Sequence, residues 1–245
     1  MADTAGAYRE RPSRLDGAVL WTRTVRPGES VPVLPDGCID LLWREGTVMV
    51  AGPDTGPHHS DSPPGTRFAG LRFFPGSAPA LLGVPADELR DRRVDLVDLW
   101  PAARVRALAA TVHAAPDPAD GLEALALRLA ADSAPPDPLL RAVVAALAAG
   151  ATVAETADTV GLGARALHRR SLSAFGYGPK TLARILRMHR ALAAARRGMS
   201  LAQAAFHAGY ADQAHFSREV TQLAGVPPAL LIGDRSADRA QGSGA

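Results

Sequence analysis

The sequence is poor in several residue types that would point to a particular class of protein. Its single cysteine, Cys38, excludes an internal disulfide framework and every cysteine-rich zinc module. No run approaches the ~18 consecutive apolar residues of a membrane span, and the first ten residues lack the basic-then-apolar order of a signal peptide. Of the 245 residues, 47% are apolar, which is ample for a core. We therefore expect a globular, soluble protein of the cytoplasm with no membrane partner.

Motifs for catalysis are also missing. No Gly-rich phosphate loop, nucleophile elbow or zinc-protease motif occurs. Metal-dependent cupins place two histidines one residue apart on a strand, so that both enter the barrel, whereas the adjacent His58 and His59 would diverge. Asp54 and Asp61 could complete only an adventitious site. We predict no enzymatic activity, no cofactor and no functional metal site.

Net charge is small for the whole chain but not for its parts. The chain carries 27 Lys and Arg against 25 Asp and Glu, and Lys180 is its one lysine. Residues 1–132 hold 14 Arg against 18 acidic residues, a net charge of −4, whereas residues 133–245 have a net charge of +6. A basic C-terminal half indicates a polyanionic partner.

Strand and helix patterns divide the chain in the same place. Segments rich in β-forming residues, separated by Gly, Pro, Asp and Ser, predict a small barrel or sandwich that ends near Gly76. The expected strands are 17–26, 38–44, 47–51 and 67–74, and the expected helices that follow are 78–91, 101–114 and 119–131. The proline-rich segment 133–138 cannot hold a helix. We predict an N-terminal domain at 1–132, a linker at 133–138, an all-helical domain at 139–234 and a flexible tail at 235–245.

The basic half contains an internal repeat, with copies at 152–179 and 200–228. Gly161 matches Gly209 at an offset of 48 residues, and Arg169 matches Arg218 at an offset of 49. Each copy begins with a residue suited to cap a helix, Thr152 or Ser200, and continues through a glycine that favours a tight turn. This order is typical of a helix-turn-helix motif.

The second helix of the second copy has one apolar and one polar face. Phe216 and Val220 share the apolar face, after Asp212 as the expected N-cap. The polar face carries donors suited to base edges and phosphates: Gln213, His215, Ser217 and Arg218. Two alternatives remain: the arginines of this half could merely solvate exposed helix faces, and His215 could have a structural role.

A long helix is expected between the two copies, over residues 180–197. Its 18 residues would span about 27 Å. Successive major grooves on one face of DNA lie about 34 Å apart. A rod of this length could therefore place two recognition helices in neighbouring grooves.

These features together resemble the DNA-binding domain of the AraC/XylS family of bacterial transcription regulators. The resemblance covers residues 138–233 and is carried by the repeat, its spacing and the string AGYADQAHFSREVTQLAGVPPALL at 208–231. It implies that the second helix of each motif enters the major groove. By position, the implied base readers are Arg165, His168 and Arg169 in the first motif and Gln213, His215 and Arg218 in the second.

The first motif departs from the family pattern at one place. Arg170 and Ser171 stand where the family usually has a bulky apolar pair. The helix thereby loses core contacts, so we expect the first motif to be displaced or less stable than the second.

The N-terminal half resembles a cupin-like domain found in such regulators, which implies effector sensing or dimerisation. The similarity lies in LPDGCIDLLW at 34–43 and GLRFFPGSAPALLGVPADEL at 70–89. Aromatic and polar side chains that could line an effector site are Trp21, Cys38, Asp40, Trp43, Arg72 and Phe74. The alternative is that these side chains pack in the core, and that Cys38 is a small buried hydrophobe.

The sequence therefore predicts an α+β protein: a β-rich cupin-like N-terminal barrel or sandwich, connecting helices and an all-α bipartite helix-turn-helix domain. The predicted function is sequence-specific transcription regulation at promoter DNA, with activation favoured by the resemblance. RNA polymerase, a small-molecule effector and a second copy in a homodimer are the further expected partners. The alternatives are a metal-dependent cupin enzyme fused to a DNA-binding module and a DNA-binding architectural protein without sequence preference.

Overall fold

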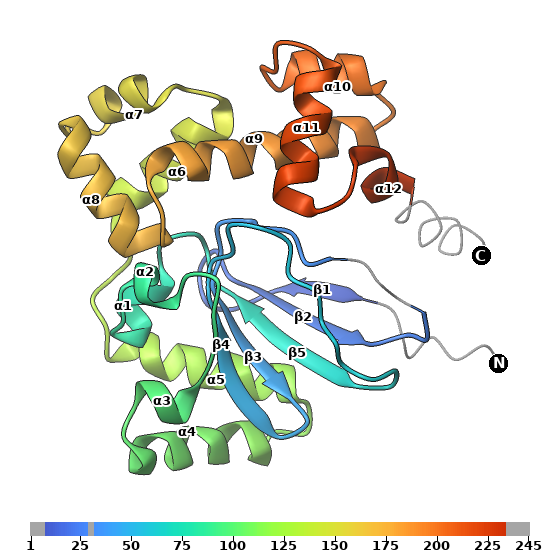
Figure 1. Cartoon of the computed structure of the whole chain (residues 1–245). Coiled ribbons are helices and arrows are strands. Elements are labelled where there is room, and N and C mark those ends of the chain that lie inside the picture. Colours follow the sequence, from blue (N-terminus) through green and yellow to red (C-terminus); the bar gives the residue numbers. More distant parts are fainter. Residues whose placement is uncertain (1–7, 29–31, 234–245) are drawn as a thin grey trace.

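The computed structural model describes residues 8–28 and 32–233, and its strands come first along the chain (Figure 1). Six strands form one antiparallel sheet in the order β1-β2-β5-β3-β4-β6. The strands are β1 (Arg9–Pro12), β2 (Val19–Thr24), β3 (Asp40–Arg44), β4 (Thr47–Ala51), β5 (Arg67–Arg72) and β6 (Arg93–Asp95). Residues 8–131, which include this sheet, are called the sheet part below.

One face of the sheet is covered by helices. Leu20, Leu41, Val50 and Leu71 are at most 1% exposed and form the core with the buried side of α5 (Pro118–Ala131). Four further helices complete this part: α1 (Ala78–Leu82), α2 (Ala86–Leu89), α3 (Leu96–Leu99) and α4 (Ala102–Ala114). The α+β class is confirmed. The barrel or sandwich takes the form of one open sheet, because α5 covers the apolar face that a second sheet would otherwise cover.

The expected strands at β2, β3, β4 and β5 are confirmed within a few residues at their ends. β1 and β6 were not expected, because RERP and RVD are short and mostly charged. The single helix expected at 78–91 is wrong. It is divided into α1 and α2 at Gly83, whose φ of 73° is left-handed and ends the first helix.

The C-terminal half is helical and is called the helical part, residues 138–233. It comprises α6 (Pro138–Ala149), α7 (Val153–Thr159), α8 (Ala164–Phe175), α9 (Pro179–Arg196), α10 (Leu201–His207), α11 (Gln213–Ala224) and α12 (Pro228–Gly233). The long helix α9 lies at its centre, with Leu182, Ile185, Met188 and Leu192 fully buried. Helices α8 and α11 lie on either side of α9 (Figure 1).

The two parts have separate apolar cores, one within residues 18–129 and one within residues 143–231. The exact domain limits at 132 and 138 stay a prediction, and the expected flexible tail at 235–245 lies outside the described residues. No helix in the described ranges is long and apolar enough to cross a membrane.

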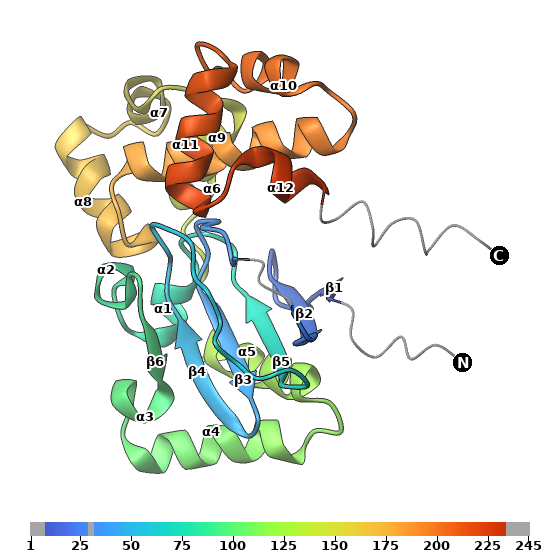
Figure 2. The ribbon, with the colours of Figure 1, turned by 45° about the vertical axis from the view of Figure 1, so that its right-hand side comes forward.

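Two loops at the end of the sheet meet the helical part (Figure 2). In the loop after β4, Pro53 lies against Gly176, the C-cap of α8, and Pro57 lies against Gly225, the C-cap of α11. A Cβ atom at Gly176 would be 2.6 Å from Pro53 Cγ, and one at Gly225 would be 3.1 Å from Pro57 Cγ. Both glycines have positive φ, and they are equivalent positions of the repeat. One loop therefore contacts the same point of both motifs.

The loop before β3 contacts α9 between the two motifs. His189 of α9 donates from Nε2 to the carbonyl oxygen of Pro35 over 2.7 Å. Leu182, two turns earlier on the same helix, lies directly against Gly37. The two loops are themselves joined, because Val33 and His58 exchange backbone hydrogen bonds of 2.8 and 3.0 Å. The sheet part thus contacts α8, α9 and α11 through one connected surface.

Candidate functional site

Both copies of the repeat form the expected helix-turn-helix. The Thr152 hydroxyl accepts from the backbone of Glu155, whose carboxylate accepts in return from the backbone of Thr152. Ser200 and Gln203 form the same capping box at the start of α10. The turn glycines Gly161 and Gly209 have φ of 66° and 80°. The caps and turns predicted from the repeat are confirmed.

The outward faces of α8 and α11 carry arginines that are available for a partner. Leu167 and Phe216 point into the core, which turns Arg165, Arg169 and Arg218 to solvent. Within the described ranges, none of these three side chains makes a hydrogen bond or an ion pair. Arg169 and Arg218 are equivalent positions of the repeat, so each motif presents one unpaired guanidinium at the same place.

Most other arginines of the helical part are held by internal bonds. Arg184 and Arg187 bind Glu219, Arg170 binds Asp137, and Arg190 donates to two backbone carbonyls. The alternative that arginines here only solvate the surface therefore fails for these four, which fasten helices together. The unpaired arginines of α8 and α11 therefore form a separate group from these bonded arginines.

The predicted polar face of α11 is only partly outward. Gln213 is exposed in the first turn of the helix, and Ser217 is half-buried. His215 packs edge-on against Tyr210, with ring centroids 5.2 Å apart, and its Nε2 is 4.0 Å from Glu219. This placement favours the structural alternative for His215. The assignment of all these residues as base readers stays a prediction.

Glu219 organises the second motif from a buried position. Arg187 binds both of its carboxylate oxygens at 2.7 and 2.8 Å, and the Tyr210 hydroxyl donates over 3.1 Å. The Arg187 guanidinium also lies 4.4 Å from the centre of the Tyr210 ring. Burial opposes ionisation of Glu219, but the bonds from Arg187 and Arg184 outweigh it and hold its pKa below the usual value. The carboxylate therefore ties α11 to α9.

The first motif lacks an equivalent of this cluster. Arg170, which occupies the position of Glu219, is exposed and pairs with Asp137 at the start of α6. Ser171 is fully buried, and its hydroxyl has no hydrogen-bond partner within the described part of the chain. His168 lies against Gly178, where a Cβ atom would be 2.7 Å from its ring. The departure seen in the sequence thus leaves a buried polar group in the first motif.

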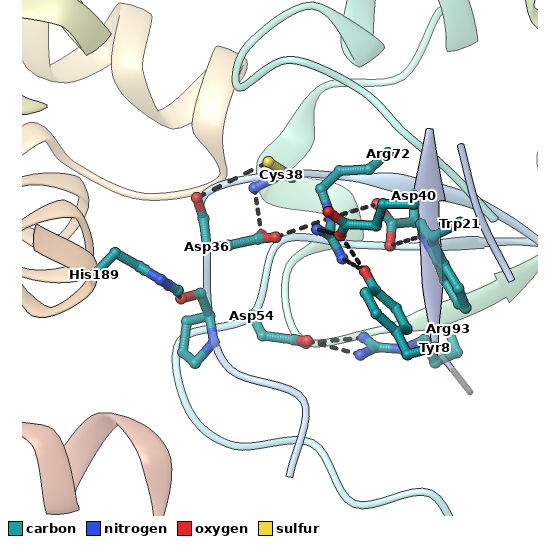
Figure 3. A network of polar contacts seen from close by, with 11 residues as sticks. Tyr8, Trp21, Asp36, Cys38, Asp40, Asp54, Arg72, Arg93 and His189 are labelled. Carbon is teal, nitrogen blue, oxygen red and sulfur yellow. Dashed lines mark hydrogen bonds and ion pairs between the residues drawn. The ribbon is translucent and has the colours of Figure 1, made fainter. Parts of the chain in front are cut away.

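Three of the predicted effector residues meet in a polar network around Arg72 (Figure 3). Its guanidinium lies 3.1 Å from Asp36, 3.5 Å from Asp40 and 3.3 Å from Glu10. The Trp21 indole donates to Asp40 over 3.2 Å. Burial raises the pKa of Asp40 to about 6, although Arg72 opposes the shift. These groups largely satisfy one another on the sheet face away from α5.

The other three effector candidates lie in different surroundings. Cys38 adjoins the network, since its backbone donates to Asp36 over 2.9 Å, and burial raises the pKa of its thiol. Phe74 faces the helical part, where the Arg141 guanidinium is 4.7 Å from its ring centre. Trp43 lies on the opposite face of the sheet and lines an open pocket of about 420 Å³. The six residues therefore do not form one site.

That pocket contains functional candidates that the sequence analysis missed. Arg9, Arg23 and Arg67 line it together with Trp43. These residues come together only through the pairing and register of their strands, which the sequence does not reveal. In addition, β1 was not recognised as a strand. No group of three or more potential metal ligands occurs in the described ranges.

Two helix-turn-helix motifs joined by one rigid helix define a DNA-binding protein of the helix-turn-helix class. Comparison with known families agrees. Residues 156–231 match the family model described as a helix-turn-helix domain, and residues 18–95 match one described as a domain of unknown function, DUF6597. No curated protein matches the sequence.

Among solved structures, the chain is similar to ToxT from Vibrio cholerae. An apo form that carries a single substitution has 12% identity and a TM-score of 0.48, over 92% of this chain and 99% of that one. The unsaturated fatty acid-bound wild-type form has 11% identity and a TM-score of 0.49, over 91% and 96%. Residues 156–231 of the helical part therefore form a helix-turn-helix domain, the type of domain with which DNA-binding regulators contact DNA.

Proposed function

We propose that the protein regulates promoters by reading two half-sites, one with α8 and one with α11, under the control of its sheet part. The observation that carries this proposal is the pair Arg169 and Arg218. They are exposed, unpaired within the described residues and equivalent in the repeat. An arginine on a helix in the major groove can bind the O6 and N7 atoms of guanine with two hydrogen bonds. Arg165, His168, Gln213 and Ser217 complete the proposed readers, and His215 supports them from its packed position against Tyr210.

The geometry of α9 supports reading both half-sites from one face of DNA. Its 18 residues span about 27 Å, and the recognition helices flank it. This length is comparable to the spacing of about 34 Å between successive major grooves on one face of DNA.

The contacts between the two parts supply a route for control. Pro53 and Pro57 fix the ends of α8 and α11 from a single loop. This loop is fastened to the sheet part, because Asp54 binds Arg93 with two bonds of 2.7 and 2.8 Å and Thr55 binds Asp91. A small molecule or a second copy that moves the loop would move both motifs together. Contact with RNA polymerase, leading to activation, completes the proposal.

A binding selection tests the proposed function. The full chain is incubated with a random duplex library, and the retained sequences are determined. We expect a recurring pair of half-sites about one helical turn apart. Equal retention of all sequences, with a steep loss of binding as salt rises, would support the architectural alternative instead. Stoichiometric metal in the purified protein would support the fused cupin enzyme.

A further inference from the structure

One row of side chains crosses four strands on the face of the sheet that α5 covers. Arg9 is opposite Thr22, Thr22 is opposite Ala69, and Ala69 is opposite Trp43. Residues directly opposite each other on neighbouring strands point to the same face. The row therefore runs from a guanidinium on β1, through a hydroxyl and a methyl group, to an indole on β3.

The next row closes one side of this surface. Thr24 of β2 is opposite Arg67 of β5. Both lie on the same face as the first row, because Thr24 is two residues after Thr22 and Arg67 is two residues before Ala69. Asp117, the N-cap of α5, and Pro118, its first residue, line the other side. The open pocket between them has a volume of about 420 Å³, within the usual range for a small-molecule site.

The charges around the pocket favour an anion. Arg67 of β5 and Arg9 of β1 lie on the same face as the pocket, whereas Arg23 lies between Thr22 and Thr24 and its side chain belongs to the opposite face; the acidic residue of the lining is Asp117. The Asp117 side chain is already occupied as the N-cap of α5, where it accepts from the backbone of Ala119 over 2.8 Å. The start of this 14-residue helix adds a partial positive charge. Arg67 is exposed and makes no hydrogen bond or ion pair in the described ranges.

The indole of Trp43 gives the pocket an apolar wall. It is half-buried against the core cluster of the sheet part, and one side of it lines the pocket. A ligand with a flat or extended apolar body could cover this indole while its charged group reaches Arg67. Inorganic phosphate or sulfate would leave the apolar wall uncovered.

We infer that this pocket is a binding site for a small organic anion: an apolar body against Trp43 and a carboxylate, sulfonate or phosphate group at Arg67. As an effector site it rests on the proposed function. It lies on the opposite face of the sheet from the Arg72 network and includes only one of the residues chosen from the sequence, Trp43.

The test uses a fluorescent probe and its uncharged analogue. The sulfonate 8-anilinonaphthalene-1-sulfonate and the neutral N-phenyl-1-naphthylamine share one apolar body and differ in the sulfonate. Titration of the full chain is expected to give saturable binding of the sulfonate and at least about tenfold weaker binding of the neutral compound, because the charge-assisted bond is lost.

Two arginine substitutions then locate the site. Arg67→Gln is expected to weaken sulfonate binding about tenfold and to leave binding of the neutral compound unchanged. The control is Arg44→Gln, an exposed arginine on β3 opposite Phe68, on the other face of the sheet. Equal affinity of wild type and Arg67→Gln for the sulfonate would overturn the site, as would equal affinity for the two compounds.

The effector role is tested separately, on DNA recovered in the binding selection. The sulfonate is expected to change the affinity of wild type for that DNA and to have no effect on Arg67→Gln. Saturable, Arg67-dependent probe binding with unchanged DNA affinity would overturn the effector role. Failure to recover any preferred DNA would instead count against the proposed function, and the probe titration does not depend on it.

Discussion

At the scale of single residues, the arginines of the helical part fall into two groups. Some are bonded within the protein, and others are exposed and available to bind a partner. Arg184, Arg187 and Arg190 are held by carboxylates or carbonyls, whereas Arg169 and Arg218 are exposed and lack partners in the described part. The repeat predicted which arginines are equivalent. It could not reveal which are bonded, because their partners come from other helices.

Arg218→Ala is expected to weaken binding to the selected DNA by about 1–3 kcal/mol, because it removes contacts to a base edge. Binding to random DNA should change much less. Both affinities can be measured by fluorescence anisotropy, with Arg44→Ala in the sheet part as the control. Equal losses on selected and random DNA would assign Arg218 to a phosphate instead.

Asp40 gives the sheet part a specific dependence on pH. Burial raises its pKa from 3.8 to about 6, so between these values the folded state binds more protons than the unfolded state. The contribution of Asp40 to the free energy of unfolding should therefore fall as pH rises from about 4 to about 6. Urea unfolding of wild type and Asp40→Asn at pH 4, 5, 6 and 7 measures this difference. The same pH profile for both proteins would contradict the assignment.

At the level of elements, the two motifs have the same outline but different interiors. α11 is fixed to α9 through the buried Glu219, whereas α8 has Arg170 on the surface and an unsatisfied Ser171 hydroxyl inside, among the described residues. The lower stability expected of the first motif from the departure at Arg170 and Ser171 stays a prediction. The sequence did not anticipate the ion pair between Arg170 and Asp137, because Asp137 precedes α6, far away along the chain.

Ser171→Ala is expected to stabilise the protein by about 1 kcal/mol, because it removes a buried hydroxyl that has no partner in the described residues. Ser173→Ala is the matched control, since Ser173 is exposed on the same helix and reports only the gain in helix propensity. Urea unfolding compares the two. A gain no larger for Ser171→Ala than for Ser173→Ala would show that the hydroxyl is satisfied.

Most of the helices and strands could be predicted from the sequence, but β1 could not. β2 to β5 combine β-forming residues with turn signals, and the helix caps at Thr152, Ser200 and Asp212 are visible in the sequence. β1 has the sequence RERP, which becomes a strand only by pairing with β2. The arginine-lined pocket beside Trp43, which includes Arg9 of β1, was missed for the same reason.

Across the whole molecule, the sheet part positions both motifs through one loop. The contacts of Pro53 and Pro57 with Gly176 and Gly225 could not be inferred from the sequence, since they join segments more than 120 residues apart. What the sequence did provide was the opposite charge of the two halves, −4 and +6.

If this loop is loosened, DNA binding should depend less strictly on the spacing between the half-sites. Arg93→Gln removes the two bonds to Asp54 that fasten the loop to the sheet part. Wild type is expected to lose affinity when one base pair is inserted between the half-sites, and Arg93→Gln to lose less. Arg92→Gln is the control, because the Arg92 side chain donates to the Glu88 carbonyl, outside this loop. Identical penalties for all three proteins would contradict a positioning role.

Hydroxyl-radical footprinting on the selected DNA tests most directly whether both motifs read one site. We predict two protected stretches about one helical turn apart on one face of the duplex. Arg169→Ala should lose protection mainly in one stretch and Arg218→Ala mainly in the other. A single protected stretch that only Arg218→Ala weakens would contradict reading by both motifs.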